Sequence, residues 1–277
     1  MSCAKLDFTL VTLGFTAALF AAGVVADEPQ VKGVVPLHTV FELRQYMLHP
    51  GQREVLVEVF DDYFVEGQEE QGMRIIGQFR DLDNPDRFVW LRSFPDMPAR
   101  AAALQSFYSG PIWKTHSRTA VATMVDSDNV FLLRPLRPET AFAASTITLP
   151  PPGTRGPGTG LVLASIVHLQ RRTPSEFGEF FEKELKPHWE RAGASVIAQM
   201  VSEPSPNTFP SLPVRERENV FVWFSLFPDQ ATLDKQRRAL ADSMEWRVVS
   251  GKLIPWTYHP IETLRLEPTA RSRLQRG

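Results

Sequence analysis

The segment FVWLRSFPD at residues 88–96 returns as FVWFSLFPD at residues 221–229. The match continues without a gap as far as Pro135 and Pro268. Four tryptophans fall at matched positions of the two copies: Trp90, Trp113, Trp223 and Trp246. The apolar start of each copy predicts a buried strand, and the closing Asp is a common N-cap residue of helices. The repeat therefore predicts two similarly folded halves.

The same order of elements surrounds each copy of the repeat. In the first half the predicted strands are 40–46, 73–79, 88–94 and 129–134. Pro50 and Gly72 bound the first predicted helix, and Asp96 begins the second. The resulting order, β-α-β-β-α-β, is that of a ferredoxin-like unit. The second half repeats it from a strand at 162–169, with a longer turn at 202–217 that contains four prolines.

We therefore predict an α+β fold of two tandem ferredoxin-like βαββαβ units. Each unit covers one sheet face with its own helices, so the two open faces can cover each other and close a barrel-like pseudo-dimer. The predicted divisions are a signal peptide (1–26), a linker (27–38), the first half (39–136), a Pro/Gly-rich linker (137–161), the second half (162–268) and a basic tail (269–277).

Composition excludes several classes of protein. The 277 residues are 43% apolar and 22% charged, which is typical of a globular protein with a sizeable core. The net charge of −2 gives no broad basic surface for nucleic acid. Only the tail is locally basic, and we expect it to be a solvated end. Cys3 is the single cysteine, so an intrachain disulfide, a cysteine-based metal site and a cysteine nucleophile are all excluded.

The N-terminus has the pattern of an export signal. An apolar run at 8–22 is followed by the small residues Val24, Val25 and Ala26. We expect cleavage near Ala26 and export to the periplasm or the extracellular space. The alternative is an uncleaved membrane anchor, because 8–26 is just long enough to cross a bilayer.

No metal or cofactor pattern is present in the sequence. None of the six histidines stands four residues from another. An HExxH sequence, a nucleophile elbow, a phosphate-binding glycine loop and a dinucleotide fingerprint are also missing. We therefore predict no metal and no cofactor, and the sequence assigns no catalytic residue.

Eight residues are candidates for a ligand site: Arg44, Tyr46, Trp90, Trp113, His116, His188, Trp223 and Trp246. The tryptophans either pack two equivalent cores or line an apolar cavity between sheet and helices. Arg44 and Tyr46 share one face of a strand and form either the polar end of such a cavity or an exposed face. His168 takes the place of Arg44 in the second half.

His116 and His188 are expected on the apolar faces of helices. Each is either a functional group, such as a general base, or a buried histidine satisfied by hydrogen bonds. The matched residues are Val249 for His116 and Phe64 for His188, and both are apolar. These matches favour the structural role.

Several segments of the first half resemble NIPSNAP domain proteins. They are FELRQY (41–46), Pro50-Gly51, Asn84-Pro85-Asp86-Arg87, FVWLRSF (88–94) and SGPIW (109–113). The resemblance is looser over 162–268, where Ser243-Met-Glu-Trp246 replaces SGPIW. That family belongs to the dimeric α/β barrel superfamily, which implies that the two units pair as a dimeric α/β barrel. A haem-binding branch of the superfamily makes His188 a candidate axial ligand.

Two classes of function stay open. The first is an exported NIPSNAP-domain protein of undefined activity that acts as a binding or assembly module. The alternative is a cofactorless monooxygenase- or isomerase-like enzyme, which needs an open cavity with a polar pair such as His116 and Arg44. We expect a small apolar ligand and a homo-oligomer, no nucleic-acid partner, and membrane contact only through an uncleaved N-terminus.

Overall fold

The computed structural model describes residues 38–143, 149–170, 174–257 and 259–275. The expected signal peptide, residues 1–26, lies outside these ranges, and so does the linker at 27–38 except for its last residue. Within the described ranges, no helix combines the length and the apolar character needed to cross a bilayer.

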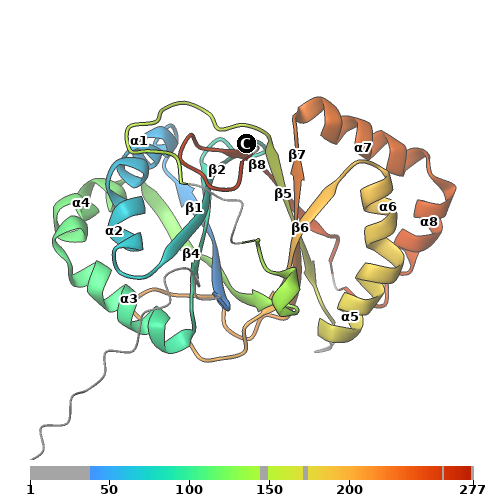
Figure 1. Ribbon diagram of the computed structural model, residues 1–277, viewed down its shortest axis with the longest axis horizontal. Helices are drawn as coiled ribbons and strands as arrows, with labels where there is room; N and C mark the ends of the chain where they lie inside the picture. The colour runs from blue at the N-terminus through green and yellow to red at the C-terminus, as the bar shows by residue number, and fades with distance from the viewer. Residues whose placement is uncertain (1–37, 144–148, 171–173, 258, 276–277) are drawn as a thin grey trace, which may run out of the picture. The chain divides into compact units, whose positions relative to one another are not determined.

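Eight antiparallel strands close a barrel (Figure 1). Their bounds are β1 Val40–Leu48, β2 Arg74–Asp81, β3 Arg87–Phe94, β4 Met124–Pro135, β5 Leu161–His168, β6 Ser195–Ser202, β7 Val220–Phe227 and β8 Glu262–Pro268. The order around the barrel is β1-β3-β2-β8-β5-β7-β6-β4, and β4 closes it by pairing with β1. Each half contributes four neighbouring strands, and the β2–β8 and β4–β6 pairs join the halves.

Helices cover the outer face of each half (Figure 1). Their bounds are α1 Arg53–Val59, η1 Phe60–Phe64, α2 Val65–Glu69, α3 Met97–Ser109, α4 Pro111–Ala122, η2 Pro138–Thr140, α5 Pro174–Phe180, η4 Phe181–Leu185, α6 Lys186–Arg191, α7 Gln230–Asp242 and α8 Met244–Gly251. Both η1 and η4 are π-helical turns, which widen the first helix of each half. The fold class is confirmed as α+β, with tandem βαββαβ units closed into a dimeric α/β barrel.

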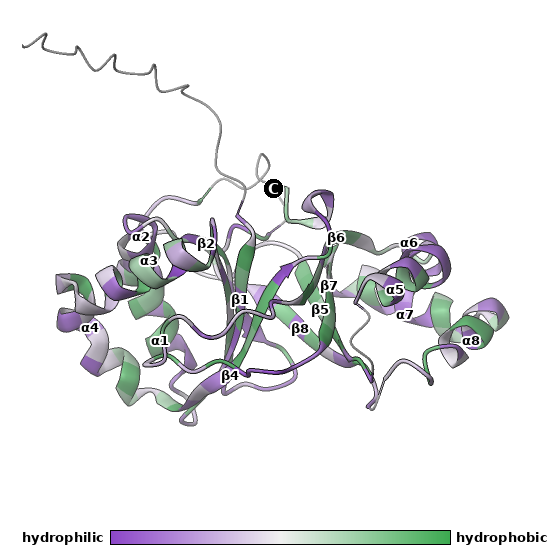
Figure 2. Ribbon diagram, turned by 90° about the horizontal axis from the view of Figure 1, so that it is seen from below, coloured by the Kyte–Doolittle hydropathy of each residue, from purple (hydrophilic) through white to green (hydrophobic). Residues whose placement is uncertain are grey.

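Alternation along the strands divides the hydrophobic core into an inner and an outer layer. In β1, Phe41 and Leu43 belong to the cluster that fills the barrel with side chains from all eight strands. Val40 and Tyr46 belong to the cluster under the helices of the first half. Most of the strands are therefore buried on both faces, and Figure 2 shows their hydrophobic stretches between the two groups of helices.

The repeated FPD sequence has the same role in both halves. Phe94 and Phe227 are the buried last residues of β3 and β7. Asp96 and Asp229 each accept a hydrogen bond, at 2.7 Å, from the backbone N–H three residues later. Each aspartate thus caps the helix that returns over the sheet, as predicted for the first of them.

One predicted helix boundary is right and one is wrong. Gly72 follows the first helical stretch with a φ of 84°, a conformation that favours glycine. Pro50 does not begin the helix, because Gly51 turns the chain with a φ of 75° and α1 begins only at Arg53.

Residues 269–275 form a packed C-terminal strap, so the prediction of a solvated tail is wrong. Arg271 is fully buried, donates a hydrogen bond to a backbone carbonyl of η1 and pairs with Glu66. Arg273 pairs with the carboxylate at the end of α2, and Leu274 packs into the barrel core. The basic side chains are therefore used to hold the strap against the acidic helix of the first half.

Asp61 is a buried carboxylate beneath the strap. Its donors are Gln78 at 3.3 Å and the Thr269 hydroxyl at 3.4 Å. Burial raises the pKa of Asp61 from the ordinary 3.8 to about 6, and the Thr269 hydrogen bond and the charge of Arg271 offset only part of that effect. The carboxyl group thus binds a proton more readily in the folded than in the unfolded chain.

This shift predicts an unusual pH dependence of stability. Between pH 4 and 6 the folded protein holds a proton that the unfolded chain releases, so the free energy of unfolding falls as pH rises. Asp61→Asn keeps an acceptor oxygen but cannot ionise. We expect this substitution to remove the decrease in unfolding free energy between pH 4 and 6, and to raise that free energy at pH 7 by about 2–3 kcal/mol. Urea denaturation of both proteins at each pH checks this.

The matched control is Asp62→Asn, because Asp62 lies next in sequence but pairs with Arg155 at the surface. We expect the control to change stability by under about 1 kcal/mol. An Asp61→Asn protein that keeps the wild-type pH dependence would contradict the assignment.

Candidate functional site

A cavity of about 480 Å³ lies between the sheet and the helices of the first half. Its lining comes from β1, β3, β4, the first helical stretch, α3, α4 and the loop between β6 and β7. The lining residues are Tyr46, Leu56, Phe60, Phe64, Gln68, Trp90, Gln105, Phe107, Tyr108, Ser109, Trp113, Val121, Met124, Ser127, Phe209, Ser211 and Leu212. Its size and its largely aromatic wall are those of a site for a small organic molecule.

Aromatic rings fix the sheet side of the cavity. Tyr46 on β1 and Trp90 on β3 meet edge to face at 5.9 Å between ring centroids. Phe60, on the π-helical turn, packs against Trp90 at 4.7 Å. Tyr46 and Trp90 lie on the same sheet face because β1 and β3 pair antiparallel and in register.

The loop between β6 and β7 closes the cavity from the second half. This loop is the long, proline-containing turn noted in the sequence. Its Phe209 stacks on Tyr108 of α3 with 5.8 Å between centroids. Leu212 packs against the same hydrophobic cluster. The site in the first half is therefore completed by residues of the second.

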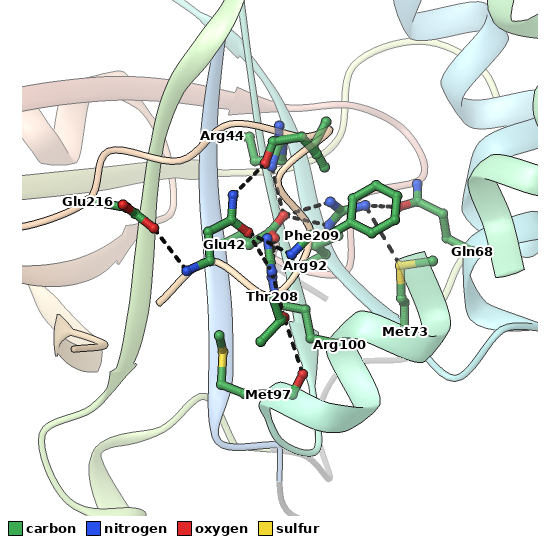
Figure 3. A network of polar contacts seen from close by, with 12 residues as sticks. Glu42, Arg44, Gln68, Met73, Arg92, Met97, Arg100, Thr208, Phe209 and Glu216 are labelled. Atoms are coloured by element: carbon green, nitrogen blue, oxygen red, sulfur yellow. Dashed lines mark hydrogen bonds and ion pairs between the residues drawn. The ribbon is translucent and has the colours of Figure 1, made fainter. Parts of the chain in front are cut away.

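Beside the cavity lies an arginine cluster, which we define as Glu42, Arg44, Arg92 and Arg100 (Figure 3). One oxygen of Glu42 accepts from Arg44 at 2.8 Å and from Arg92 Nε at 2.7 Å. The other oxygen accepts from Arg100 Nε at 2.6 Å. All four side chains are 0% exposed, which is rare for charged residues.

The remaining donors of the cluster reach three parts of the chain. Arg44 Nε donates to the Tyr46 hydroxyl at 2.9 Å. Arg92 donates to Gln68 Oε1 at 2.7 Å. Arg100 donates to Asn207 and Thr208, in the loop of the second half. The cluster therefore joins the sheet, the first helical stretch and that loop at the edge of the cavity.

Electrostatics set the protonation of the cluster. Burial alone would raise the pKa of Glu42, but the attraction of Arg92, Arg44 and Arg100 outweighs it and holds that pKa well below its ordinary range. The pKa of Arg100 is lowered, chiefly by burial, with repulsion from the other two arginines adding to the shift. Burial also raises the pKa of Tyr46, so its phenol stays protonated at neutral pH.

The second half has no such cluster at the matched strand positions. Ser165 pairs with Trp223 as Arg44 pairs with Trp90, so the expected match of His168 to Arg44 is wrong. The same strand register, continued along β5 and β7, gives the other matches. Leu163 stands for Glu42, Val167 for Tyr46, Ser225 for Arg92 and Leu233 for Arg100. Neutral side chains thus replace the charges and the phenol.

Trp189 fills the space of the second half that stays open in the first. Counting from the matched π-helical turns, Trp189 stands where the first half has Gln68. Its ring packs edge to face on Trp223 at 5.6 Å and against Trp246 at 5.8 Å. Its indole N–H donates to Ser225, the residue that replaces Arg92. The two halves thus share a backbone arrangement and differ in the side chains that lie between sheet and helices.

The structure separates the eight candidate residues. Tyr46, Trp90 and Trp113 line the cavity, and Arg44 stands behind Tyr46. Trp223 and Trp246 pack with Trp189 in the second half. The proposed roles of these residues in binding a ligand stay predictions.

Neither candidate histidine lines the cavity. His116 is half-buried and stacks on Tyr63 with 3.6 Å between centroids. His188 lies within hydrogen-bond distance of Arg191 and 6.3 Å from the ring of Trp246. The π-helical turns match Leu185, not His188, to Phe64, which corrects the expected correspondence. The cavity therefore does not bring His116 together with Arg44.

Glu42, Arg92 and Arg100 were not predicted as site residues. A signal for two of them was present, because the strand register puts Glu42 on the face of Arg44 and Arg92 on the face of Trp90. The convergence of Arg100 from α3 depends on tertiary packing and leaves no local pattern.

The geometry predicts that Glu42 is essential for stability. Glu42→Gln leaves three buried guanidinium groups without a counter-charge, and we expect a loss of about 3–5 kcal/mol in the free energy of unfolding. Glu54→Gln removes an ion pair with Arg80 whose carboxylate is more than half exposed, and should cost under about 1 kcal/mol. If urea denaturation showed equal losses of unfolding free energy for the two substitutions, the prediction would be contradicted.

Comparisons with known proteins agree on the fold. The structure is similar to a candidate monooxygenase from Lactobacillus acidophilus NCFM, with 11% identity, 83% of this chain and 94% of that chain covered, and a TM-score of 0.50. It is also similar to an anthrone oxidase-like protein, with 9% identity, coverage of 87% and 97%, and a TM-score of 0.52. At these identities the likeness concerns the fold alone.

The sequence adds a family for one part of the chain. A comparison with curated proteins gives no match. The NIPSNAP family model matches residues 41–138, which span β1 to β4 and all the lining of the cavity except the loop of the second half. Residues 41–138 of this chain therefore match the NIPSNAP family, within a chain that has a dimeric α/β barrel fold.

Proposed function

We propose that this protein binds a small apolar molecule in the cavity of its first half. The observation that carries the proposal is the contrast at one matched position, where Gln68 leaves the cavity open and Trp189 fills the second half. A chain that needed only a packed core would gain stability from a large side chain at both places. The open cavity therefore supports a binding role for the first half.

The second half then acts as a partner that completes the site. It closes the barrel through β6 and β8, and its loop covers the cavity with Phe209 and Leu212. Thr208 of the same loop accepts a hydrogen bond from Arg100. Because the second half contributes residues to the site of the first, the arrangement supports one binding site rather than two equivalent sites.

Catalysis receives less support than binding. The lining residues include only two titratable side chains, Tyr46 and Tyr108. A general base with a pKa near neutrality is the usual requirement for abstracting a proton, and His116 lies elsewhere. A monooxygenase-like activity stays the alternative, in line with the names of the structural neighbours.

Three further expectations stay proposals. Export depends on residues 1–26, which lie outside the described residues. A homo-oligomer agrees with what is usual in the family that the first half resembles. An internal duplication agrees with the segment at 88–96 that returns at 221–229.

The cavity predicts saturable binding of a neutral apolar probe. N-phenyl-1-naphthylamine, which fluoresces in apolar surroundings, should bind the purified protein at a single site. Gln105 is an exposed residue of the lining, and we expect Gln105→Trp to weaken this binding at least about tenfold by occupying the entrance. A fluorescence titration measures both affinities.

Ala102→Trp is the matched control, because Ala102 is exposed on the same helix but does not line the cavity. It should bind the probe like the wild type. Probe binding that is equally affected by both substitutions, or that never saturates, would contradict the proposed function.

A further inference from the structure

The arginine cluster carries more positive charge than its own carboxylate neutralises. Three guanidinium groups face one carboxylate, which leaves two positive charges on side chains that are 0% exposed. In the described part of the chain, Glu42 is the only carboxylate within ion-pair distance of these arginines. Buried surplus charge is costly, so its presence requires a reason other than packing.

Tyr46 connects this charge to the cavity. Its hydroxyl oxygen accepts from Arg44 Nε at 2.9 Å, and its ring lines the cavity. A phenol whose oxygen already accepts a hydrogen bond still has its own proton to donate. Among the described residues, no group accepts that proton, so it is available to a molecule in the cavity.

A second donor lies beside Tyr46. The indole N–H of Trp90 is buried without a hydrogen-bond partner among the described residues, and Trp90 also lines the cavity. The guanidinium carbons of Arg92 and Arg44 lie 4.8 and 5.6 Å from the centre of the Trp90 ring. Arg44 Nη2 is likewise buried and unpartnered. Two residues that each have an unused neutral donor, backed by surplus positive charge, therefore line one cavity.

The second half shows which part of this arrangement is distinctive. Trp223, matched to Trp90, also has an unpartnered indole N–H, so that feature alone does not mark a site. The arginines and Tyr46 have neutral counterparts there, two serines, a leucine and a valine, and Trp189 packs on Trp223. The surplus charge thus lies beside the open cavity of the first half, and neutral side chains and Trp189 take the matched places in the second.

We propose that the ligand of the cavity is an apolar monocarboxylate whose carboxylate accepts hydrogen bonds from Tyr46 and Trp90 and is balanced by the arginine cluster. This inference rests on the proposed function and specifies its ligand. Two donors suit the two oxygens of a carboxylate, and one negative charge reduces the surplus from two to one. The many aromatic rings of the lining suit an apolar body of similar size.

Displacement of N-phenyl-1-naphthylamine tests the charge requirement directly. The competitors are 1-naphthoate and 1-naphthalenemethanol, which have nearly the same shape and differ in charge at pH 8. We expect the carboxylate to bind the wild-type protein at least about tenfold more tightly than the alcohol. Equal affinities, with probe binding intact, would overturn this inference and leave the proposed function standing.

Substitution at Tyr46 tests the contact. Tyr46→Phe removes only the hydroxyl group, and we expect it to weaken 1-naphthoate about tenfold while changing the affinity for the alcohol less than about twofold. Tyr63→Phe removes the same group from an exposed ring that does not line the cavity, and should change neither affinity. A Tyr46→Phe protein that keeps the wild-type preference for the carboxylate would overturn the assigned contact.

The two proposals fail in distinguishable ways. Absence of saturable binding of the neutral probe would overturn both, because the inference needs the cavity. Should Tyr46→Phe fail to fold, the comparison of the two competitors on the wild-type protein decides the charge requirement alone.

Discussion

The carboxylate of Glu42 is the interaction on which the first half depends. It stands between guanidinium groups from three elements, β1, β3 and α3. All of these groups are buried, so water does not screen their charges. Because a buried charge is tolerated only with a partner in good geometry, these elements can approach one another only in the arrangement that Glu42 permits. The position of α3, and with it one wall of the cavity, follows from that constraint.

Barrel closure explains why an asymmetric pair of halves is stable. The interior is filled by alternating side chains of all eight strands, so stability does not require the outer layers to be alike. One outer layer is packed with tryptophans from helix and strand. The other has room to place charge and an open volume under its helices. The same backbone plan thus permits a half with an open cavity beside a half packed with tryptophans.

The sequence predicted the fold better than the site, for a physical reason. Strand alternation and the capping role of Asp96 are local patterns, and the repeat made them visible twice. The arginine cluster requires three segments to meet, which only tertiary packing determines. Trp189 lies outside the gapless register of the repeat, so its match to Gln68 appears only when the π-helical turns are aligned.

The C-terminal strap also has a consequence for biosynthesis. Its last residues pack against the first half, where Leu274 donates a backbone hydrogen bond to Ile76 in β2 and Arg271 holds the helix below. A ribosome makes these residues after all eight strands, long after β2 has emerged. The first half therefore reaches its final packing only after the whole of the second half has been made.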